Sequence, residues 1–287
     1  PYAWSVIWPS EGEPEPTDEL PLHWVYVDGY SIGKYEITNQ QYCDVLTWAL
    51  DQGYLRDFAG DLWAGTGSIY ATLGEPYILV NMDRVECNIQ YIDGAFYPKS
   101  RTGLPGITSY SMGTHPMVTV SWYGAAAYCN WLSEIEGVTP CYDMTTENWD
   151  LVTAPPTSGG YRLPTEAEWE RAAAWDGVKH WIYGCSSDAL DATRCNFYLD
   201  ALVNPLGLAV KPFTSPAGWF DGVNISPSGD VQTVDGASPS GVYDLSGNVW
   251  EWCQDWYDAY PPDAQTNPTG PALGTERVLR GGSFEDL

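Results

Sequence analysis

The chain has 287 residues, of which 44% are hydrophobic, with 15 Trp and 20 Tyr, so it can bury a core and is too apolar to be disordered. Its 12 Lys and Arg against 38 Asp and Glu give a formal net charge of −26. This charge argues against nucleic acid and anionic lipid as partners, and since no stretch approaches the ~20 apolar residues of a membrane span, we expect no membrane insertion.

The N-terminal half alternates predicted elements with irregular chain. We expect residues 1–19 to form an extended lead-in and residues 20–287 to form a single domain in a processed or trimmed chain. Alternating apolar and polar residues predict a strand over 24–32. Thr38 is a suitable N-cap, and Tyr42, Val45, Leu46 and Ala49 recur at helical spacing. Residues 51–114 are aromatic and weakly periodic, which predicts an insertion of short strands and turns.

Two further helices and a long loop follow. Ser121 is the expected N-cap of a helix over 122–134. Thr165 with Glu168 fits the capping-box pattern and predicts a helix that ends near Ala174. Glu166 and Glu170 on that helix are interpreted, like Glu168, as caps and salt-bridge partners. Residues 175–241 are expected to be almost entirely loop, in keeping with the 29 Gly and 22 Pro of the chain.

The cysteines indicate an oxidising compartment. No pair has CxxC spacing and there are three histidines, which argues against a structural zinc site. Disulfides are the better interpretation. Cys185 and Cys195 bracket a short loop and form the most plausible pair, and Cys129 and Cys141 could also pair. The odd count leaves at least one cysteine unpaired or paired outside this chain. The full set is Cys43, Cys87, Cys129, Cys141, Cys185, Cys195 and Cys253.

Five ordered blocks carry a family resemblance. They cover residues 34–42, 115–122, 161–170, 241–252 and 277–284. With this set the chain resembles the formylglycine-generating enzyme family, also called the sulfatase-modifying factor domain, from about Leu20 to Phe284. The resemblance implies an α+β, C-type-lectin-like fold of the formylglycine-generating enzyme type. Such a fold is loop-rich, with a small twisted antiparallel sheet, a few short helices and loops held by calcium.

The block around residues 244–251 predicts a calcium site. Asp244 and Glu251 flank a tight Ser-Gly-Asn turn that can aim backbone carbonyls at a common centre. Oxygen-only ligation suits Ca²⁺, which takes six to eight oxygens in flexible geometry. The resemblance implies that the side chains of Asp244 and Glu251 and the carbonyls of Gly247 and Val249 are the ligands. The alternative, that both carboxylates only cap the loop, stays open.

The resemblance implies two further sets of residues. A weaker second calcium site, in a loop that departs from the family's spacing, maps to Asn196, Phe197, Asp221 and Val223. A binding cleft maps to Trp250 and Ser283. His115 lies in a family block and is interpreted as structural.

Two functions are compatible with these motifs. Family enzymes oxidise a sulfatase cysteine to formylglycine with copper held by two cysteines after the Gly-Gly-Ser block, and here only four residues follow Ser283. We therefore interpret the family's C-terminal tail as missing and expect no copper in this chain. The first hypothesis is a module of the bacterial non-catalytic branch, secreted or on the cell surface, that binds a protein or glycan or self-assembles into a larger structure. The alternative is a copper-dependent oxidase whose cysteine pair lies beyond Leu287.

Overall fold

The computed structural model describes residues 2–3, 20–21, 23–61, 63–102, 109–151, 159–198, 206–208 and 210–286. These residues form a loop-rich α+β structure with three helices and several small sheets, as expected. The chain divides into two compact units. Unit 1 comprises Pro1–Glu36, Pro164–Pro205 and Gly218–Leu287, and unit 2 comprises Ile37–Leu163 and Leu206–Ala217. The predicted lead-in over 1–19 lies outside the described residues, apart from residues 2 and 3.

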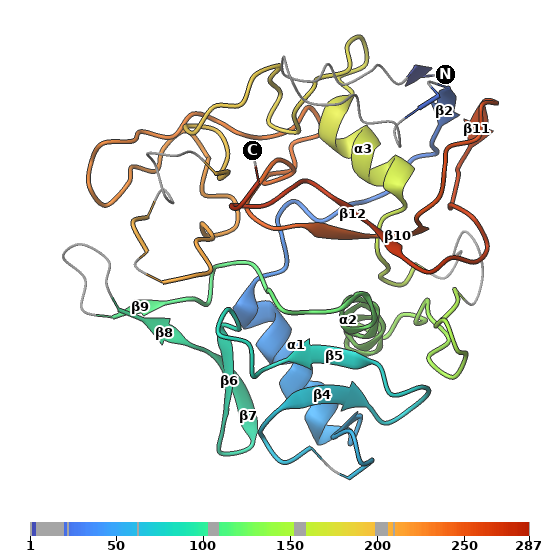
Figure 1. The fold of residues 1–287 in the computed structure, drawn as a ribbon, viewed down its shortest axis with the longest axis vertical. Coiled ribbons are helices and arrows are strands. Elements are labelled where there is room, and N and C mark those ends of the chain that lie inside the picture. Colours follow the sequence, from blue (N-terminus) through green and yellow to red (C-terminus); the bar gives the residue numbers. More distant parts are fainter. Residues whose placement is uncertain are drawn as a thin grey trace. The chain divides into compact units, whose positions relative to one another are not determined.

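Unit 2 contains two helices and three small antiparallel sheets. Helix α1 (Asn39–Asp51) packs against strand β7, and α2 (Trp122–Ile135) packs against β5 and α1 (Figure 1). The sheets have the strand orders β3-β4-β5, β6-β7 and β8-β9. Their strands are β3 (Leu55–Arg56), β4 (Ser68–Ala71), β5 (Ile78–Asn81), β6 (Ile89–Ile92), β7 (Ala95–Pro98), β8 (Ser100–Arg101) and β9 (Tyr110–Ser111). The described part of 51–114 therefore contains short strands and turns, as expected.

The core of unit 2 forms where the helices meet the strands. Tyr42 of α1 stacks on Tyr128 of α2, with ring centroids 5.3 Å apart. His115 is fully buried, and its ring nitrogens lie 2.8 Å from the hydroxyls of Thr214 and Tyr110. Burial lowers the pKa of His115 to about 3. The ring is therefore neutral and fixed, in agreement with a structural role.

Unit 1 is built around helix α3 (Glu166–Ala174) and the antiparallel pair β10 (Glu251–Trp256) and β12 (Arg277–Arg280). A second sheet has the order β1-β2-β11, formed by β1 (Tyr2–Ala3), β2 (Trp24–Tyr26) and β11 (Gln265–Thr266). Helix α3 packs on β10 and β12 (Figure 1). The buried core between them consists of Trp169, Ala172, Ala173, Ala174, Val242, Leu245, Cys253 and Val278.

The local helix predictions are confirmed. Thr38, Ser121 and Thr165 are the N-caps, and each side-chain oxygen accepts a hydrogen bond from a backbone amide of the first turn. The predicted strand over 24–32 is too long, because only Trp24–Tyr26 has a pairing partner. The described part of 175–241 contains isolated bridges and turns but no strand or helix, as predicted.

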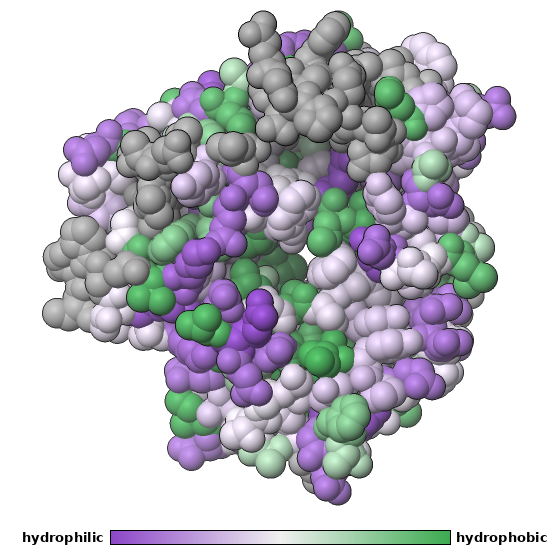
Figure 2. All heavy atoms as spheres, viewed as in Figure 1, coloured by the Kyte–Doolittle hydropathy of each residue, from purple (hydrophilic) through white to green (hydrophobic). Residues whose placement is uncertain are grey.

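The exposed surface is mixed rather than uniformly polar. Figure 2 shows hydrophilic side chains spread over the drawn face between smaller groups of hydrophobic ones. Exposed apolar side chains such as Trp24, Val178 and Trp250 come from separate segments. Among the helices of the described chain, none combines the length and the apolar character that a membrane crossing requires.

Candidate functional site

The turn at residues 244–251 lies between two other segments of unit 1. The Asn248 amide donates to the Asn196 carbonyl at 2.7 Å, and the Gly247 amide donates to the Gly281 carbonyl at 2.7 Å. The Phe284 amide in turn donates to the Asn248 carbonyl at 3.0 Å. The turn needs left-handed backbone at three positions, with φ of +64° at Asp244, +82° at Gly247 and +61° at Asn248. These bonds hold the predicted calcium-binding turn in one conformation.

Of the two predicted carboxylate ligands, Asp244 is buried and Glu251 is partly buried. Asp244 is 6% exposed, and its Oδ2 accepts a 2.5 Å hydrogen bond from the Gly218 amide. Glu251 Oε2 accepts from the Trp169 indole Nε1 at 2.7 Å. Burial raises the pKa of Asp244 to about 7. Burial, with a smaller contribution from the charge of Asp244, raises the pKa of Glu251 to about 8.

A third carboxylate, Glu36, reaches the same turn. Its Oε2 accepts from Asn248 Nδ2 at 2.7 Å, whereas its Oε1 exposes less than 1 Å² and has no hydrogen-bond partner. Burial raises the pKa of Glu36 well above its usual range, and the charges of Asp244 and Glu251 raise it further. Sequence reasoning placed Glu36 in a family block but gave it no role, because nothing local links it to the turn.

These three acids influence one another's protonation. The largest influences on their pKa values are burial, hydrogen bonds and other carboxylates, with no Lys, Arg or His among them. Buried negative charge without a basic partner is costly, and a divalent cation would relieve that cost. Among the described residues, no group of three or more His, Cys, Asp and Glu side chains could hold a metal ion, so Glu36, Asp244 and Glu251 do not form such a group. A bound Ca²⁺ would therefore also need carbonyl oxygens, as expected for Gly247 and Val249.

Members of the second predicted calcium set are bonded to groups of their own. Asn196 is buried beside the 244–251 turn, and its Nδ2 donates to Asn248 Oδ1 at 3.1 Å. Asp221 is exposed, and its Oδ1 accepts from the amides of Val223 and Asn224 at 2.7 and 2.8 Å. Asp221 thus caps its own turn, and Val223 is 76% exposed. Phe197 directly follows Asn196 in the chain. The second calcium site stays a prediction.

Of the two predicted cleft residues, Trp250 lies in the 244–251 turn and Ser283 lies in the segment that the turn contacts. Trp250 is 47% exposed. Ser283 Oγ donates to Asp286 Oδ2 at 2.6 Å and accepts from the Glu285 amide at 3.2 Å. The bond between the Phe284 amide and the Asn248 carbonyl brings their two segments together. An exposed indole beside a fixed polar turn is suited to contact with a ligand.

Comparison with known proteins identifies the family. The family model described as "Sulfatase-modifying factor enzyme 1-like domain" matches residues 8–287. The chain belongs to this family. The 244–251 turn and the Gly281–Gly282–Ser283 segment that it contacts are therefore parts of a sulfatase-modifying factor domain, as their motifs predicted.

Relatives in this family differ in length and in name. Formylglycine-generating enzyme of Thermomonospora curvata is 29% identical over 277 residues, which cover 93% of this chain and 74% of that protein. Serine/threonine-protein kinase pkn1 of Chlamydia caviae is 34% identical over 177 residues, which cover 60% of this chain. This chain spans only 20% of that kinase. The solved structure of PvdO from Pseudomonas aeruginosa matches with 20% identity and a TM-score of 0.47, covering 100% of this chain and 80% of that one.

The predicted disulfide partners lie together. All seven cysteines are thiols in this structure, and all are buried. A hydrogen bond from the Cys195 thiol lowers the pKa of Cys185, and the same contact, followed by burial, raises the pKa of Cys195. The two sulfurs are thus within contact. The Cys185–Cys195 disulfide stays a prediction.

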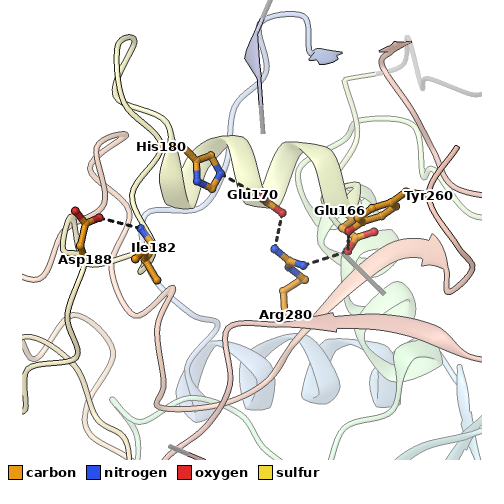
Figure 3. Close-up of polar contacts among 7 residues, drawn as sticks. All are labelled: Glu166, Glu170, His180, Ile182, Asp188, Tyr260 and Arg280. Carbon is orange, nitrogen blue, oxygen red and sulfur yellow. Dashed lines mark hydrogen bonds and ion pairs between the residues drawn. The ribbon is translucent and has the colours of Figure 1, made fainter. Parts of the chain in front are cut away.

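An ion-pair network that the sequence did not reveal joins α3 to β12. Arg280 Nη1 lies 3.3 Å from Glu166 Oε1, and its Nη2 lies 2.5 Å from Glu170 Oε2. Figure 3 shows Arg280 between these two acids, with His180 beside Glu170 and Tyr260 beside Glu166. His180 Nε2 lies 3.1 Å from Glu170 Oε1, and the Tyr260 hydroxyl donates to Glu166 Oε1 at 2.7 Å. Arg280 directly precedes the Gly-Gly-Ser segment, so the network fixes where that segment begins.

Replacing Arg280 with Met is expected to lower the free energy of unfolding by about 2–4 kcal/mol, because two mostly buried carboxylates lose their shared cation. The Arg280 and Glu170 side chains are each 15% exposed. Urea denaturation followed by Trp fluorescence measures the change. Arg84→Met is the control, because Arg84 is 65% exposed in its pair with Glu86 and its loss is expected to cost under about 0.5 kcal/mol. Equal losses in the two variants would contradict the role of Arg280.

Proposed function

We propose that this chain is a non-catalytic extracellular module that presents a binding or assembly surface on a calcium-stabilised sulfatase-modifying factor scaffold. The observation that carries the proposal is the fixed 244–251 turn, where Asn248 bonds the Glu36 carboxylate, Asp244 accepts from the Gly218 amide and Glu251 accepts from the Trp169 indole. Trp250 is the candidate contact residue, since its indole is half exposed beside this turn. Its partner would be a protein, a glycan or a further copy of the chain.

The acidic composition supports this proposal. A formal net charge of −26 favours divalent cations and disfavours nucleic acid as partners. A disulfide between Cys185 and Cys195 would suit a secreted or cell-surface location. Calcium would be held by the carboxylates of Asp244 and Glu251 with carbonyls of the turn, and it would stabilise loops that have few regular hydrogen bonds. It would supply structure and no chemical step.

Calcium is expected to raise the melting temperature by several degrees relative to excess EGTA, because an ion that binds only the folded state stabilises it by mass action. Differential scanning fluorimetry of EGTA-treated protein, with CaCl₂ added back, measures the shift. Magnesium at the same concentration is the control, since it demands a smaller octahedral site. An unchanged melting temperature with calcium would remove this ion from the proposal.

The alternative function, a copper-dependent oxidase, is tested on the same preparation. Copper-loaded protein is mixed with a cysteine-containing peptide, and oxygen uptake and peptide thiol are followed. We expect neither to change relative to copper alone. Oxygen uptake with loss of peptide thiol above the copper control would support the oxidase, which is motivated by the formylglycine-generating enzymes among the relatives.

A further inference from the structure

Cys185 directly follows a residue that is packed against the 244–251 turn. The amide of this residue, Gly184, donates to Ser246 Oγ at 2.8 Å. A Cβ at Gly184 would lie 2.7 Å from the Leu245 carbonyl oxygen, so the two backbone segments are in close contact. The chain just before Cys185 is therefore fixed against the turn.

Cys195 directly precedes a second residue that is bonded to the same turn. The Asn196 carbonyl accepts from the Asn248 amide at 2.7 Å, and Asn196 Nδ2 donates to Asn248 Oδ1 at 3.1 Å. Asn196 also forms a parallel bridge with Gly247. The loop that contains both cysteines therefore leaves the turn at Gly184 and returns to it at Asn196.

The two thiols of this loop meet in a buried place. Cys185 is 1% exposed and Cys195 is 4% exposed. A hydrogen bond between their side chains lowers the pKa of Cys185 and raises the pKa of Cys195. Because the thiolate is the reactive form of cysteine, Cys185 is the better nucleophile of the two. Two thiols in contact, of unequal acidity, are placed to form a disulfide.

We propose that Cys185 and Cys195 form a thiol–disulfide latch, which locks the two segments bonded to the 244–251 turn when it is oxidised and loosens them when it is reduced. The disulfide would join the chain neighbours of Gly184 and Asn196 covalently, so that neither could leave the turn independently. Closing so short a loop also restricts the unfolded chain. The inference needs neither a metal ion nor a binding partner.

The latch closes by thiol–disulfide exchange with a small disulfide such as glutathione disulfide. The Cys185 thiolate attacks one glutathione sulfur, which forms a mixed disulfide and releases the first glutathione thiol. The Cys195 sulfur then attacks the Cys185 sulfur and displaces the second. The two cysteines are oxidised and lose two protons, and one glutathione disulfide is reduced to two thiols that take up these protons. Since both cysteines are buried, exchange occurs when the loop opens.

The first test asks whether the bond forms. Protein in excess EGTA is incubated with glutathione disulfide or with a phosphine reductant, and its free thiols are alkylated as it is unfolded for digestion without reductant. Trypsin cuts after Arg194, between the two cysteines, and a Glu-specific protease cuts after Glu251, which separates Cys195 from Cys253. We expect mass spectrometry to find the peptides of Cys185 and Cys195 cross-linked in the oxidised sample alone. Oxidised protein without this cross-link would overturn the proposal.

The second test asks whether the bond holds the turn. Hydrogen exchange of peptides that cover 244–251 is followed by mass spectrometry in the same two samples. We expect exchange to be at least about ten-fold slower in the oxidised sample, because opening of the turn must then break its contacts with Gly184 and Asn196 together. Equal exchange in the two samples would show a disulfide without influence on the turn, and the latch would be rejected.

Cys185→Ala combined with Cys195→Ala removes the latch. In this double variant the turn should exchange alike in the oxidised and the reduced sample. Cys253→Ala is the matched control, because Cys253 is a buried cysteine of the same unit on β10. It should leave the difference between the two samples intact. A difference that persists in the double variant, or disappears in C253A, would assign the redox effect to other cysteines and overturn the proposal. If the double variant does not fold, the two wild-type measurements decide.

Discussion

Raising the pH from 6 to 8 in excess EGTA is expected to lower the free energy of unfolding by on the order of 4 kcal/mol. The cause is a set of buried acids in unit 1 that keep their protons in the folded state. Burial raises the pKa of Asp244 and of Asp255 to about 7, and that of Glu251 to about 8. Urea denaturation at a series of pH values, followed by Trp fluorescence, measures this loss.

The direction follows from proton binding. Over this pH range the unfolded chain has ionised Asp and Glu, whereas the folded chain still holds protons on these groups. Stability therefore falls by ~1.4 kcal/mol per pH unit for each group until its folded pKa is passed. His115 acts in the opposite direction, because its pKa is lowered to about 3. Below about pH 6.5 the unfolded chain binds a proton on this residue that the folded chain does not bind. The free energy of unfolding therefore rises slightly with pH through His115, up to about pH 7.

The proposed calcium site would distinguish the acids of the turn, Asp244 and Glu251, from Asp255. With saturating Ca²⁺, the ionised forms of Asp244 and Glu251 would be stabilised, so the loss between pH 6 and 8 should become clearly smaller. The contribution of Asp255, which lies at the start of α3, should persist, and Asp255→Asn should remove it with or without calcium. Constant or rising stability from pH 6 to 8 in EGTA would contradict the buried, uncompensated state of these carboxylates.

The elements that sequence reasoning predicted well are those with local causes. Thr165 and Glu168, three residues apart, form a capping box. Helix α3 begins at Glu166, directly after Thr165. Whether a segment forms a strand depends on a pairing partner, which can lie anywhere in the chain. The alternating pattern over 24–32 could not show that only β2 finds neighbours, one of them the parallel strand β11 at Gln265–Thr266.

In the candidate site, too, the residues of one local motif were predicted and those from distant segments were not. Asp244 and Glu251 were predicted because they flank one turn; the structure buries Asp244 and partly buries Glu251. Glu36 was missed because it lies 212 positions before Asn248, the residue of the turn that it contacts. Glu166 and Glu170 were interpreted as caps and salt-bridge partners, but only the packing of α3 on β12 shows that both bind Arg280. Interactions of distant segments are set by tertiary packing, which local periodicity does not encode.

Replacing Gly247 with Ala is expected to destabilise unit 1 by about 3–4 kcal/mol through two separable effects. Its φ of +82° is unfavourable for any residue with a Cβ. A Cβ at this position would also lie 2.2 Å from the Asn196 carbonyl oxygen and 2.9 Å from its carbon. Both neighbours are backbone atoms, so neither can move away without breaking the bond between Asn196 and Asn248.

Gly241→Ala isolates the first effect. Gly241 has nearly the same φ, +81°, but a Cβ there would meet nothing within 4 Å. Its replacement should cost only the ~1–2 kcal/mol of left-handed backbone. We therefore expect urea denaturation to show G247A about 1–3 kcal/mol less stable than G241A, with the calcium-induced rise in melting temperature lost in G247A alone. Equal stability of the two variants would show that the turn tolerates displacement, and an intact calcium response in G247A would mean that its backbone is not part of the site.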